Sequence, residues 1–215
     1  MIRAVISDFG GVLTTPVAGS LHAFAERSGI TLAIMGSAFE SLRARDGVHP
    51  LHELECGRMT QAAFVEVLQE ALCSLSGRPV ALPGFAELLD DLLPNEPMIA
   101  LMASLRAEGY RMALLTNNVR EWDQRWRAMA PVDDIFEVVV DSAFVGVRKP
   151  DPEIYELCCA RLGVDAGECL FVDDRKDNCE GARAVGMRAV RYVDFEQAAG
   201  EIRAALNGAP DPAGG

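Results

Sequence analysis

The chain has 215 residues, of which 50% are hydrophobic and 24% are charged, with a formal net charge of −12 and a pI near 4.7. This composition is typical of a globular protein and excludes a disordered or fibrous chain. The length suits one large domain, or one domain that carries an insertion. An acidic surface repels phosphate backbones and anionic lipids, so we expect neither nucleic acid nor a membrane as a partner.

The cysteines and the N-terminal segment point to a cytoplasmic protein. The six cysteines are Cys56, Cys73, Cys158, Cys159, Cys169 and Cys179, and no two of them have C-x-x-C spacing. The sequence therefore predicts neither a zinc site nor a disulfide framework. The apolar N-terminal stretch has no basic start and no small-residue cleavage site, and no apolar run is long enough to span a bilayer.

Five short apolar runs predict the strands of a buried sheet. They are continuous rather than alternating, which is typical of parallel strands covered by helices on both faces. The predicted strands are Arg3–Ser7, Arg111–Leu115, Glu137–Val140, Cys169–Val172 and Ala189–Val193. The predicted helices among them are Pro97–Glu108, Glu121–Met129, Pro152–Leu162, Asn178–Val185 and Glu196–Leu206. This alternation predicts an α/β fold with a doubly wound parallel sheet.

Residues 15–95 interrupt the alternation. They contain helical patterns at Ser20–Ser28, Thr31–Ala44 and Thr60–Leu75, with Thr60 as a helix N-cap, and no convincing strand. We predict an inserted helical cap over 15–95, and an α/β core formed by 1–14 and 96–207. Because α/β folds bind ligands at the carboxyl ends of their strands, a cap at this position would cover a site. The Gly- and Pro-rich residues 208–215 predict a disordered tail.

Polar residues follow four of the five predicted strands. Asp8 follows the first strand, with Gly10 and Gly11 close behind it, and Thr116 follows the second. A strand-end Asp can act as a nucleophile or metal ligand, and a hydroxyl can bind a phosphoryl oxygen. Each residue also has a simpler explanation, because Asp can cap a turn and Thr can begin a helix.

Lys149 and the pair Asp173–Asp174 complete the pattern. Lys149 precedes Pro150 and a predicted helix, so it is either a cation that neutralises a phosphoryl group or an ordinary loop lysine. Two carboxylates about 5 Å apart repel by roughly 3 kcal/mol at an effective dielectric near 20. If Asp8 lies beside the pair, a hard divalent cation, most simply Mg²⁺, would relieve this repulsion.

Together these residues predict a phosphoryl-transfer site. The carboxyl ends of parallel strands meet at one edge of a sheet, so the four positions should converge there. A carboxylate nucleophile, a hydroxyl, a lysine and an acidic pair are the groups that attack, oxygen binding, charge neutralisation and metal binding require.

Four segments of the chain resemble the motifs of the haloacid dehalogenase-like hydrolase superfamily. They are VISDFGGVL, ALLTNN, VRKPDPEIY and FVDDRKDNCEGARAVGM, in the superfamily's order. The chain is most similar to the helically capped subgroup that includes the N-terminal phosphatase domain of epoxide hydrolases. The resemblance implies an aspartyl-phosphate mechanism on a small phosphorylated metabolite. Its implied site has Asp8 as nucleophile, Thr116, Asn117 and Lys149 as substrate ligands, and Asp8, the Gly10 carbonyl, Asp173 and Asp174 at Mg²⁺.

Gly10 departs from the superfamily's phosphatase pattern, which has an acid/base Asp at this position. Loss of general acid–base catalysis costs about 10²–10⁴-fold in rate. Good leaving groups, such as those of sugar 1-phosphates and acyl phosphates, should suffer least. Water or a cap side chain could replace the Asp, and the cap candidates, each more simply a solvated or packing residue, are His22, His49, His52, Glu53 and Glu55.

Three other functions fit part of the pattern. A 2-haloacid dehalogenase also lacks the second Asp, but it lacks the paired-Asp metal site as well. A member that binds phosphate ligands with little turnover would also explain Gly10. A two-component receiver has similar residues, but there the acidic pair precedes the phosphoacceptor, whereas here Asp8 comes first. The sequence identifies neither the substrate nor the oligomeric state, and it leaves open whether the Lys149–Pro150 bond is cis.

Overall fold

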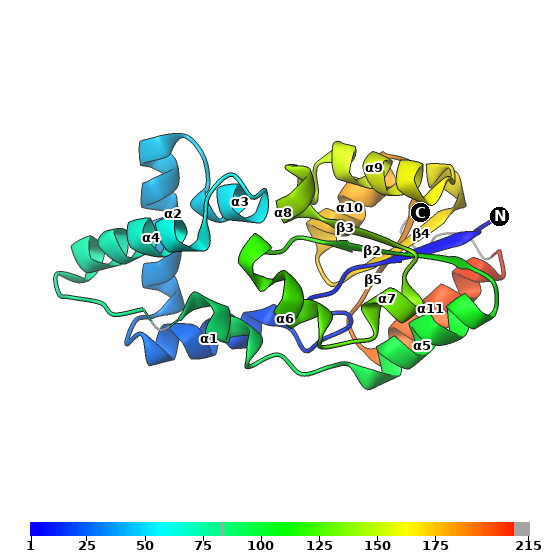
Figure 1. Cartoon of the computed structure of the whole chain (residues 1–215), viewed down its shortest axis with the longest axis horizontal. Coiled ribbons are helices and arrows are strands. Elements are labelled where there is room, and N and C mark those ends of the chain that lie inside the picture. Colours follow the sequence, from blue (N-terminus) through cyan, green and yellow to red (C-terminus); the bar gives the residue numbers. More distant parts are fainter. Residues whose placement is uncertain (83, 209–215) are drawn as a thin grey trace.

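A computed structural model describes residues 1–82 and 84–208. Its centre is one parallel sheet whose strand order is β3-β2-β1-β4-β5, with β1 in the middle (Figure 1). The strands are β1 Ala4–Ser7, β2 Arg111–Thr116, β3 Val138–Asp141, β4 Cys169–Asp173 and β5 Arg188–Arg191. The chain moves outward from β1 in both directions, so the predicted doubly wound α/β fold is confirmed.

Helices cover both faces of the sheet (Figure 1). One face packs against α5 Glu96–Ala107, α6 Asp123–Arg127, α7 Val132–Ile135 and α11 Phe195–Leu206. The other packs against α9 Pro152–Leu162 and α10 Lys176–Ala184. The remaining core elements are the 3₁₀ turns η2 Arg120–Trp122 and η3 Ala166–Glu168 and the short helix α8 Ser142–Val145.

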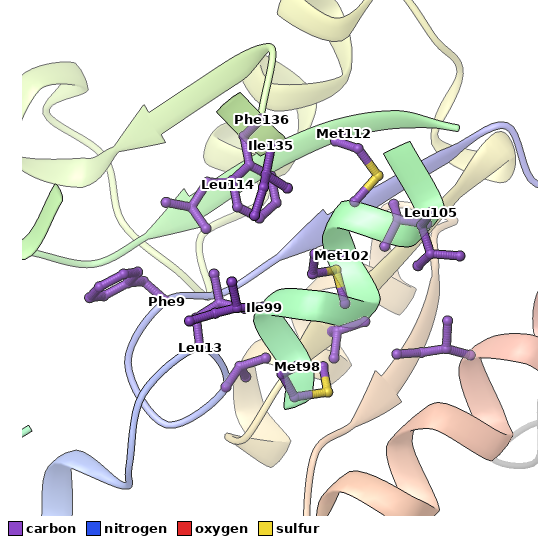
Figure 2. Close-up of a cluster of buried hydrophobic side chains, with 14 of the residues drawn as sticks. Phe9, Leu13, Met98, Ile99, Met102, Leu105, Met112, Leu114, Ile135 and Phe136 are labelled. Atoms are coloured by element: carbon purple, nitrogen blue, oxygen red, sulfur yellow. The ribbon is translucent and has the colours of Figure 1, made fainter. Parts of the chain in front are cut away.

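Side chains of each strand alternate between the two apolar layers. In β1, Val5 packs with the α5 side and Ile6 packs with the α9 side, and neither is exposed. Figure 2 shows Met98, Met102 and Leu105 of α5 in the same apolar cluster as Met112 and Leu114 of β2. This burial on both faces explains why the strands are uniformly apolar in sequence.

Residues between β1 and α5 form a helical unit with its own apolar cluster. Its elements are α1 Val17–Arg27, α2 Leu32–Asp46, α3 Pro50–Glu55, α4 Gln61–Ser76 and the 3₁₀ turn η1 Phe85–Leu89. Buried members of the cluster include Phe24, Met35, Phe64, Leu68, Leu72 and Phe85. In Figure 1, α2 and α4 lie at the opposite end of the molecule from the N-terminus. We refer to this unit as the cap, and its predicted limits at 15 and 95 stay a prediction.

Threonine caps begin the two long cap helices. The Thr31 hydroxyl accepts from Ile34 N at 3.2 Å, and the Thr60 hydroxyl accepts from Ala63 N at 3.2 Å. The prediction that Thr60 is an N-cap is therefore confirmed. None of the helices in residues 1–82 and 84–208 is long and apolar enough to cross a membrane.

Several predicted boundaries differ from the structure. The single helix predicted over Glu121–Met129 is a 3₁₀ turn, η2, followed by the short helix α6. The prediction missed α3, α7 and α8, because helices of four to six residues are too short to show a hydrophobic period. Strand β5 ends at Arg191 rather than Val193, since Val193 N donates to the side chain of Gln197 in α11. Residues 209–215 of the predicted tail lie outside the described ranges.

Gly57 allows the cap to approach the core closely. It has φ +65°, and a Cβ there would lie 2.2 Å from the carbonyl oxygen of Ala143 in α8. The neighbouring contact runs from the Ser142 hydroxyl to the Glu55 carbonyl at 2.5 Å. A side chain at position 57 would therefore push α3 away from α8.

Replacing Gly57 with Ala should lower the free energy of unfolding by about 1–3 kcal/mol, because a strained φ and a backbone clash arise together. Gly36→Ala is the matched control, since Gly36 is exposed in α2 with no atom within 4 Å of the added Cβ. It should raise the free energy of unfolding by up to about 1 kcal/mol. Urea unfolding measures both, and equal effects would contradict this account of Gly57.

Candidate active site

Three neighbouring strands end beside one another at the cap side of the sheet. The register pairs Ser7 of β1 with Leu114 of β2 and with Val172 of β4. Asp8 directly follows β1, Thr116 ends β2 and Asp173 ends β4. The parallel pairing therefore brings these residues together from three distant parts of the chain, as predicted for strand carboxyl ends.

Lys149 lies between two of the carboxylates. Its Nζ is 2.7 Å from Asp8 Oδ1 and 2.7 Å from Asp173 Oδ2, and the residue is 0% exposed. Burial alone would lower the pKa of Lys149, but the charges of Asp173 and Asp8 outweigh it and raise that pKa. The lysine is therefore a protonated cation held at the strand ends.

Asn117 holds the backbone of Lys149 in place. Its side-chain Nδ2 donates to Lys149 O at 3.0 Å, and its Oδ1 accepts from Lys149 N at 2.9 Å. The Lys149–Pro150 peptide bond that follows is cis. The predicted role of Asn117 is contact with substrate, and in the structure its amide also positions Lys149. Contact with substrate stays a prediction.

Asp173 is fully engaged by protein donors. Its Oδ1 accepts from Arg175 N at 2.8 Å, and Asn178 Nδ2 lies 3.0 Å from both of its oxygens. The backbone of Asn178 is held in turn by the hydroxyl of Tyr155 at 2.8 Å. Asp173 therefore orients Lys149. Sequence reasoning gave Asn178 no role, although it lies five residues after Asp173, in the first turn of α10.

One carboxylate oxygen from each of Asp8, Asp173 and Asp174 lies within 4.8 Å of the other two. Burial raises the pKa of Asp8 to about 8, opposed by Lys149 and assisted by Asp173 and Asp174. Burial also raises the pKa of Asp174, and Asp173 adds to the shift. In the described residues Oδ1 of Asp8 accepts from Phe9 N at 2.7 Å and pairs with Lys149, while Oδ2 has no hydrogen-bond partner.

These oxygens fit a hard divalent cation. In residues 1–82 and 84–208, no cation lies at hydrogen-bond distance from the Asp174 carboxylate or from Oδ2 of Asp8, and Mg²⁺ prefers such oxygen ligands. Gly11 leaves the room that Asp174 needs, since it has φ +82° and a Cβ there would lie 2.6 Å from Asp174 Oδ2. Because both oxygens of Asp173 are already engaged, the donor set favours Asp8 and Asp174 as direct ligands. Ligation by Asp173 and by the Gly10 carbonyl stays a prediction.

The space beside Gly10 is partly filled by the cap. A Cβ at position 10 would lie 2.9 Å from Cγ2 of Val17, the first residue of α1. Gly10 is not among the glycines with positive φ, so its backbone conformation does not itself require glycine. An acid/base side chain at this position would therefore need Val17 to move. The absence of an Asp at position 10 thus agrees with the close packing of α1 against Gly10.

A cavity of about 180 Å³ lies between the strand ends and the cap. Gly10, Thr116 and Asn117 border it on the core side. Thr116 is 2% exposed, so its hydroxyl is available only to a molecule inside the cavity. A ligand in the cavity could therefore contact Thr116, and its predicted substrate-binding role stays a prediction.

Of the five predicted cap candidates, Glu55 is the one that lines this cavity. Its carboxylate pairs with Arg148 at 2.7 Å, and burial raises its pKa against the opposing charge of Arg148. The others point elsewhere: His22 pairs with Glu26, His49 and His52 stack on each other with centroids 4.6 Å apart, and Glu53 pairs with Arg58.

The fold and the site define an α/β protein with a buried lysine and a carboxylate cluster at its strand ends, and the comparisons identify its family. The family model of the haloacid dehalogenase-like hydrolases matches residues 2–186. The chain therefore belongs to this family, as its four motifs predicted. Solved haloacid dehalogenases are among the structures with the same fold.

Two relatives and one solved structure illustrate the likeness. Phosphatase MT3486 of Mycobacterium tuberculosis is 41% identical over 212 residues, which cover 87% of this chain and 86% of that protein. Bifunctional epoxide hydrolase 2 of Rattus norvegicus is 27% identical over 94% of this chain, which spans 38% of the relative's length. A family enzyme of Bacteroides thetaiotaomicron, in complex with magnesium and inorganic phosphate, has a TM-score of 0.63 at 23% identity, over 90% of this chain and 95% of that one.

The raised pKa of Asp8 makes the effect of Mg²⁺ depend on pH. A carboxyl whose pKa is higher in the folded chain lowers the free energy of unfolding as pH rises between its two values, here from 3.8 to about 8. With EDTA, the protein should thus lose stability as pH increases toward about 8. Mg²⁺ should compensate for the ionised carboxylates, so the Mg²⁺-induced rise in Tm should be larger at about pH 8 than at about pH 6.

Thermal unfolding with EDTA or Mg²⁺ measures this effect. Mg²⁺ at about a hundred times its Kd adds about 2.7 kcal/mol, which raises Tm by roughly 5–10 °C for a domain of this size. Asp174→Asn should remove most of the rise. Asp177→Asn, at an exposed carboxylate paired with Arg175, is the control and should preserve it. A rise that is independent of pH and unchanged in Asp174→Asn would contradict the metal site.

Proposed function

We propose that this hydrolase is a Mg²⁺-dependent phosphatase that acts on a small phosphorylated metabolite through an aspartyl-phosphate on Asp8. The observation that carries the proposal is Lys149, whose ammonium pairs with Asp8 and Asp173 at 2.7 Å in the same cluster as Asp174. The 41% identity with a phosphatase over most of both chains supports it.

The residues of this chain divide the work of the reaction. Oδ2 of Asp8 attacks phosphorus, the Asp8–phosphorus bond forms, and the bond to the leaving oxygen breaks. Since Gly10 supplies no acid, the leaving oxygen takes its proton from water or from a cap side chain. Lys149 and the Thr116 hydroxyl stabilise the charge on the phosphoryl oxygens. When bound, Mg²⁺ supplies positive charge that orients the phosphoryl group and neutralises its oxygens. Water then attacks phosphorus, which releases inorganic phosphate and returns Asp8 to a carboxylate.

The cap would exclude bulk water during these steps. The cavity lies between the strand ends and the cap helices. Glu55 of α3 lines it and forms an ion pair with the core residue Arg148. Exclusion of water strengthens the electrostatic interactions of Lys149 and Thr116 with the phosphoryl group.

Hydrolysis of a carbon–halogen bond is the second candidate, and Gly10 favours it because this reaction needs no leaving-group acid at that position. The acidic cluster favours phosphate chemistry instead. Hydrolysis of a carbon–halogen bond needs no metal ion, so it would give the three clustered carboxylates no function as a cation site. Release of phosphate or of halide, each measured with and without EDTA, separates the two. Halide release that persists in EDTA would favour the dehalogenase.

Replacing Asp8 with Asn should lower kcat at least about a thousandfold, because the amide is a poor nucleophile and loses the charge that pairs with Lys149. Phosphate release from p-nitrophenyl phosphate in the presence of Mg²⁺ measures the loss. Circular dichroism of the variant checks that it is folded. Full activity in Asp8→Asn would show that the measured activity does not use this site.

Introducing an Asp at position 10 should raise kcat for poor leaving groups. Gly10→Asp requires room, so the test combines it with Val17→Ala, and Val17→Ala alone is the control. We expect kcat for an alkyl phosphate to rise by about tenfold or more, and that for p-nitrophenyl phosphate to change little, because general acid catalysis is worth about 10²–10⁴-fold for a basic leaving oxygen.

Unchanged kcat for the alkyl phosphate would mean that another group already supplies the proton. Glu55 would then be the residue to replace, as the carboxyl that the cap contributes to the cavity. In that case Glu55→Gln should lower kcat for the alkyl phosphate far more than for p-nitrophenyl phosphate. Equal losses of kcat for both substrates would mean that Glu55 supports the structure through its ion pair with Arg148 and does not donate a proton.

A further inference from the structure

The cavity beneath the cap has a mostly apolar wall. The apolar residues that line it come from both the core and the cap, namely Phe9, Val17, Leu21, Met35, Phe39, Leu51, Leu68, Phe85, Leu88, Leu89, Leu92, Val119 and Trp122. A phosphoryl group needs none of them, because its charged partners are Lys149 and the carboxylate cluster at the strand ends. If the cavity holds substrate, its apolar wall must therefore contact the organic part of that substrate.

Three polar side chains that line the cavity have partners inside the protein, and a fourth, Thr116, is the one assigned above to the phosphoryl group. Both polar atoms of the Asn117 amide bind the backbone of Lys149, and Oδ1 of Asn118 accepts from Val119 N at 2.9 Å. The Glu55 carboxylate pairs with Arg148. A sugar or glycerol chain would thus place its hydroxyls against hydrocarbon, where each unsatisfied hydroxyl weakens binding by roughly five- to a hundredfold.

We propose that the substrate is a phosphate monoester whose organic group is apolar and about five to eight carbon atoms in size. This inference rests on the proposed function. The size follows from the cavity volume of about 180 Å³, because an apolar protein cavity of about 150 Å³ holds one benzene molecule. Substrates with good leaving groups should suffer least from the lack of an acid at position 10. Of these, sugar 1-phosphates fit the apolar wall poorly because of their hydroxyls.

The residues nearest the phosphoryl position fit this orientation. Gly10 and Thr116 lie at the core end of the cavity, whereas Met35 and Leu68 belong to the cap helices α2 and α4. Met35 is 2% exposed and Leu68 is 0% exposed. Asp8 and Lys149 do not line the cavity, which reaches the site at Gly10 and Thr116, so the ester group of a phosphate at Asp8 would enter it past these two residues.

A series of n-alkyl phosphates, from ethyl to dodecyl, tests the proposal on the wild-type protein with Mg²⁺. We expect kcat/KM to rise about fourfold for each added methylene, since one buried CH₂ contributes about 0.8 kcal/mol. The rise should stop at about six to eight carbons, where the cavity is full. Glycerol 1-phosphate and glucose 6-phosphate should be poorer than butyl phosphate. Equal kcat/KM across the series, or preference for the polar esters, would overturn the proposal.

Binding measured without turnover separates this inference from the proposed function. Calorimetric dissociation constants of the same alkyl phosphates for Asp8→Asn, with Mg²⁺ present, should show the same dependence on chain length. If the wild type hydrolyses all esters equally well, the phosphatase assignment stands and the apolar cavity proposal fails. If Asp8→Asn keeps full activity, the proposed mechanism fails, whereas the dependence of binding on chain length still tests the cavity.

Leu51→Asn provides a test of the wall itself. Leu51 lines the cavity and is half-buried in α3, while the control Leu75→Asn changes a leucine that is 49% exposed at the end of α4. Leu51→Asn should lower the ratio of kcat/KM for hexyl phosphate to that for ethyl phosphate by about tenfold or more. Leu75→Asn should leave the ratio unchanged. An unchanged ratio in a folded Leu51→Asn protein would contradict the proposal, and the alkyl series decides the matter if that variant does not fold.

Discussion

The buried ion pairs of Lys149 connect the site to the fold. The lysine has no exposure, and its cost of burial is offset only because two carboxylates lie 2.7 Å from it. One carboxylate follows the central strand and the other ends the strand beside it. Removing Lys149 would leave two buried carboxylates without their cation, which would be strongly destabilising. The parallel register of β1 and β4 and the position of Lys149 therefore depend on each other.

The supporting contacts extend this arrangement to two further elements. Asn117, after β2, binds the backbone of Lys149, and Asn178, in α10, binds both oxygens of Asp173. These two residues hold the charged groups in place. The proposed cation and phosphoryl group would bind on the side formed by Asp174 and Oδ2 of Asp8, for which the described residues supply no hydrogen-bond partner. Such positioning before the reaction reduces the reorganisation that the transition state requires.

Strand patterns made most of the core predictable from sequence. The apolar strands and the helix Pro152–Leu162 could be located because their hydrophobic patterns and capping residues are strong. The convergence of Asp8, Thr116 and Asp173 followed from parallel strand ends, whereas Lys149 comes after both β3 and α8 and was placed only approximately by the same argument. The short helices α3, α7 and α8 were not predictable, since no hydrophobic period fits within so few residues. The apolar cavity was not predictable either, because the orientation of Leu51 or Phe39 toward the core depends on how the cap helices pack.

Oxygen isotope labelling tests most directly whether Asp8 is phosphorylated and then released by attack of water on phosphorus. The protein is incubated with Mg²⁺ and an alkyl phosphate in water enriched in ¹⁸O. Mass spectrometry then measures ¹⁸O in the inorganic phosphate and in the peptide that contains Asp8. Rapid quenching of the same reaction should also trap one phosphoryl group on that peptide. Our account predicts ¹⁸O in the phosphate and none in Asp8. Incorporation of ¹⁸O into the Asp8 carboxylate, with no phosphorylated peptide, would contradict it, because water would then attack an ester carbon as in dehalogenation.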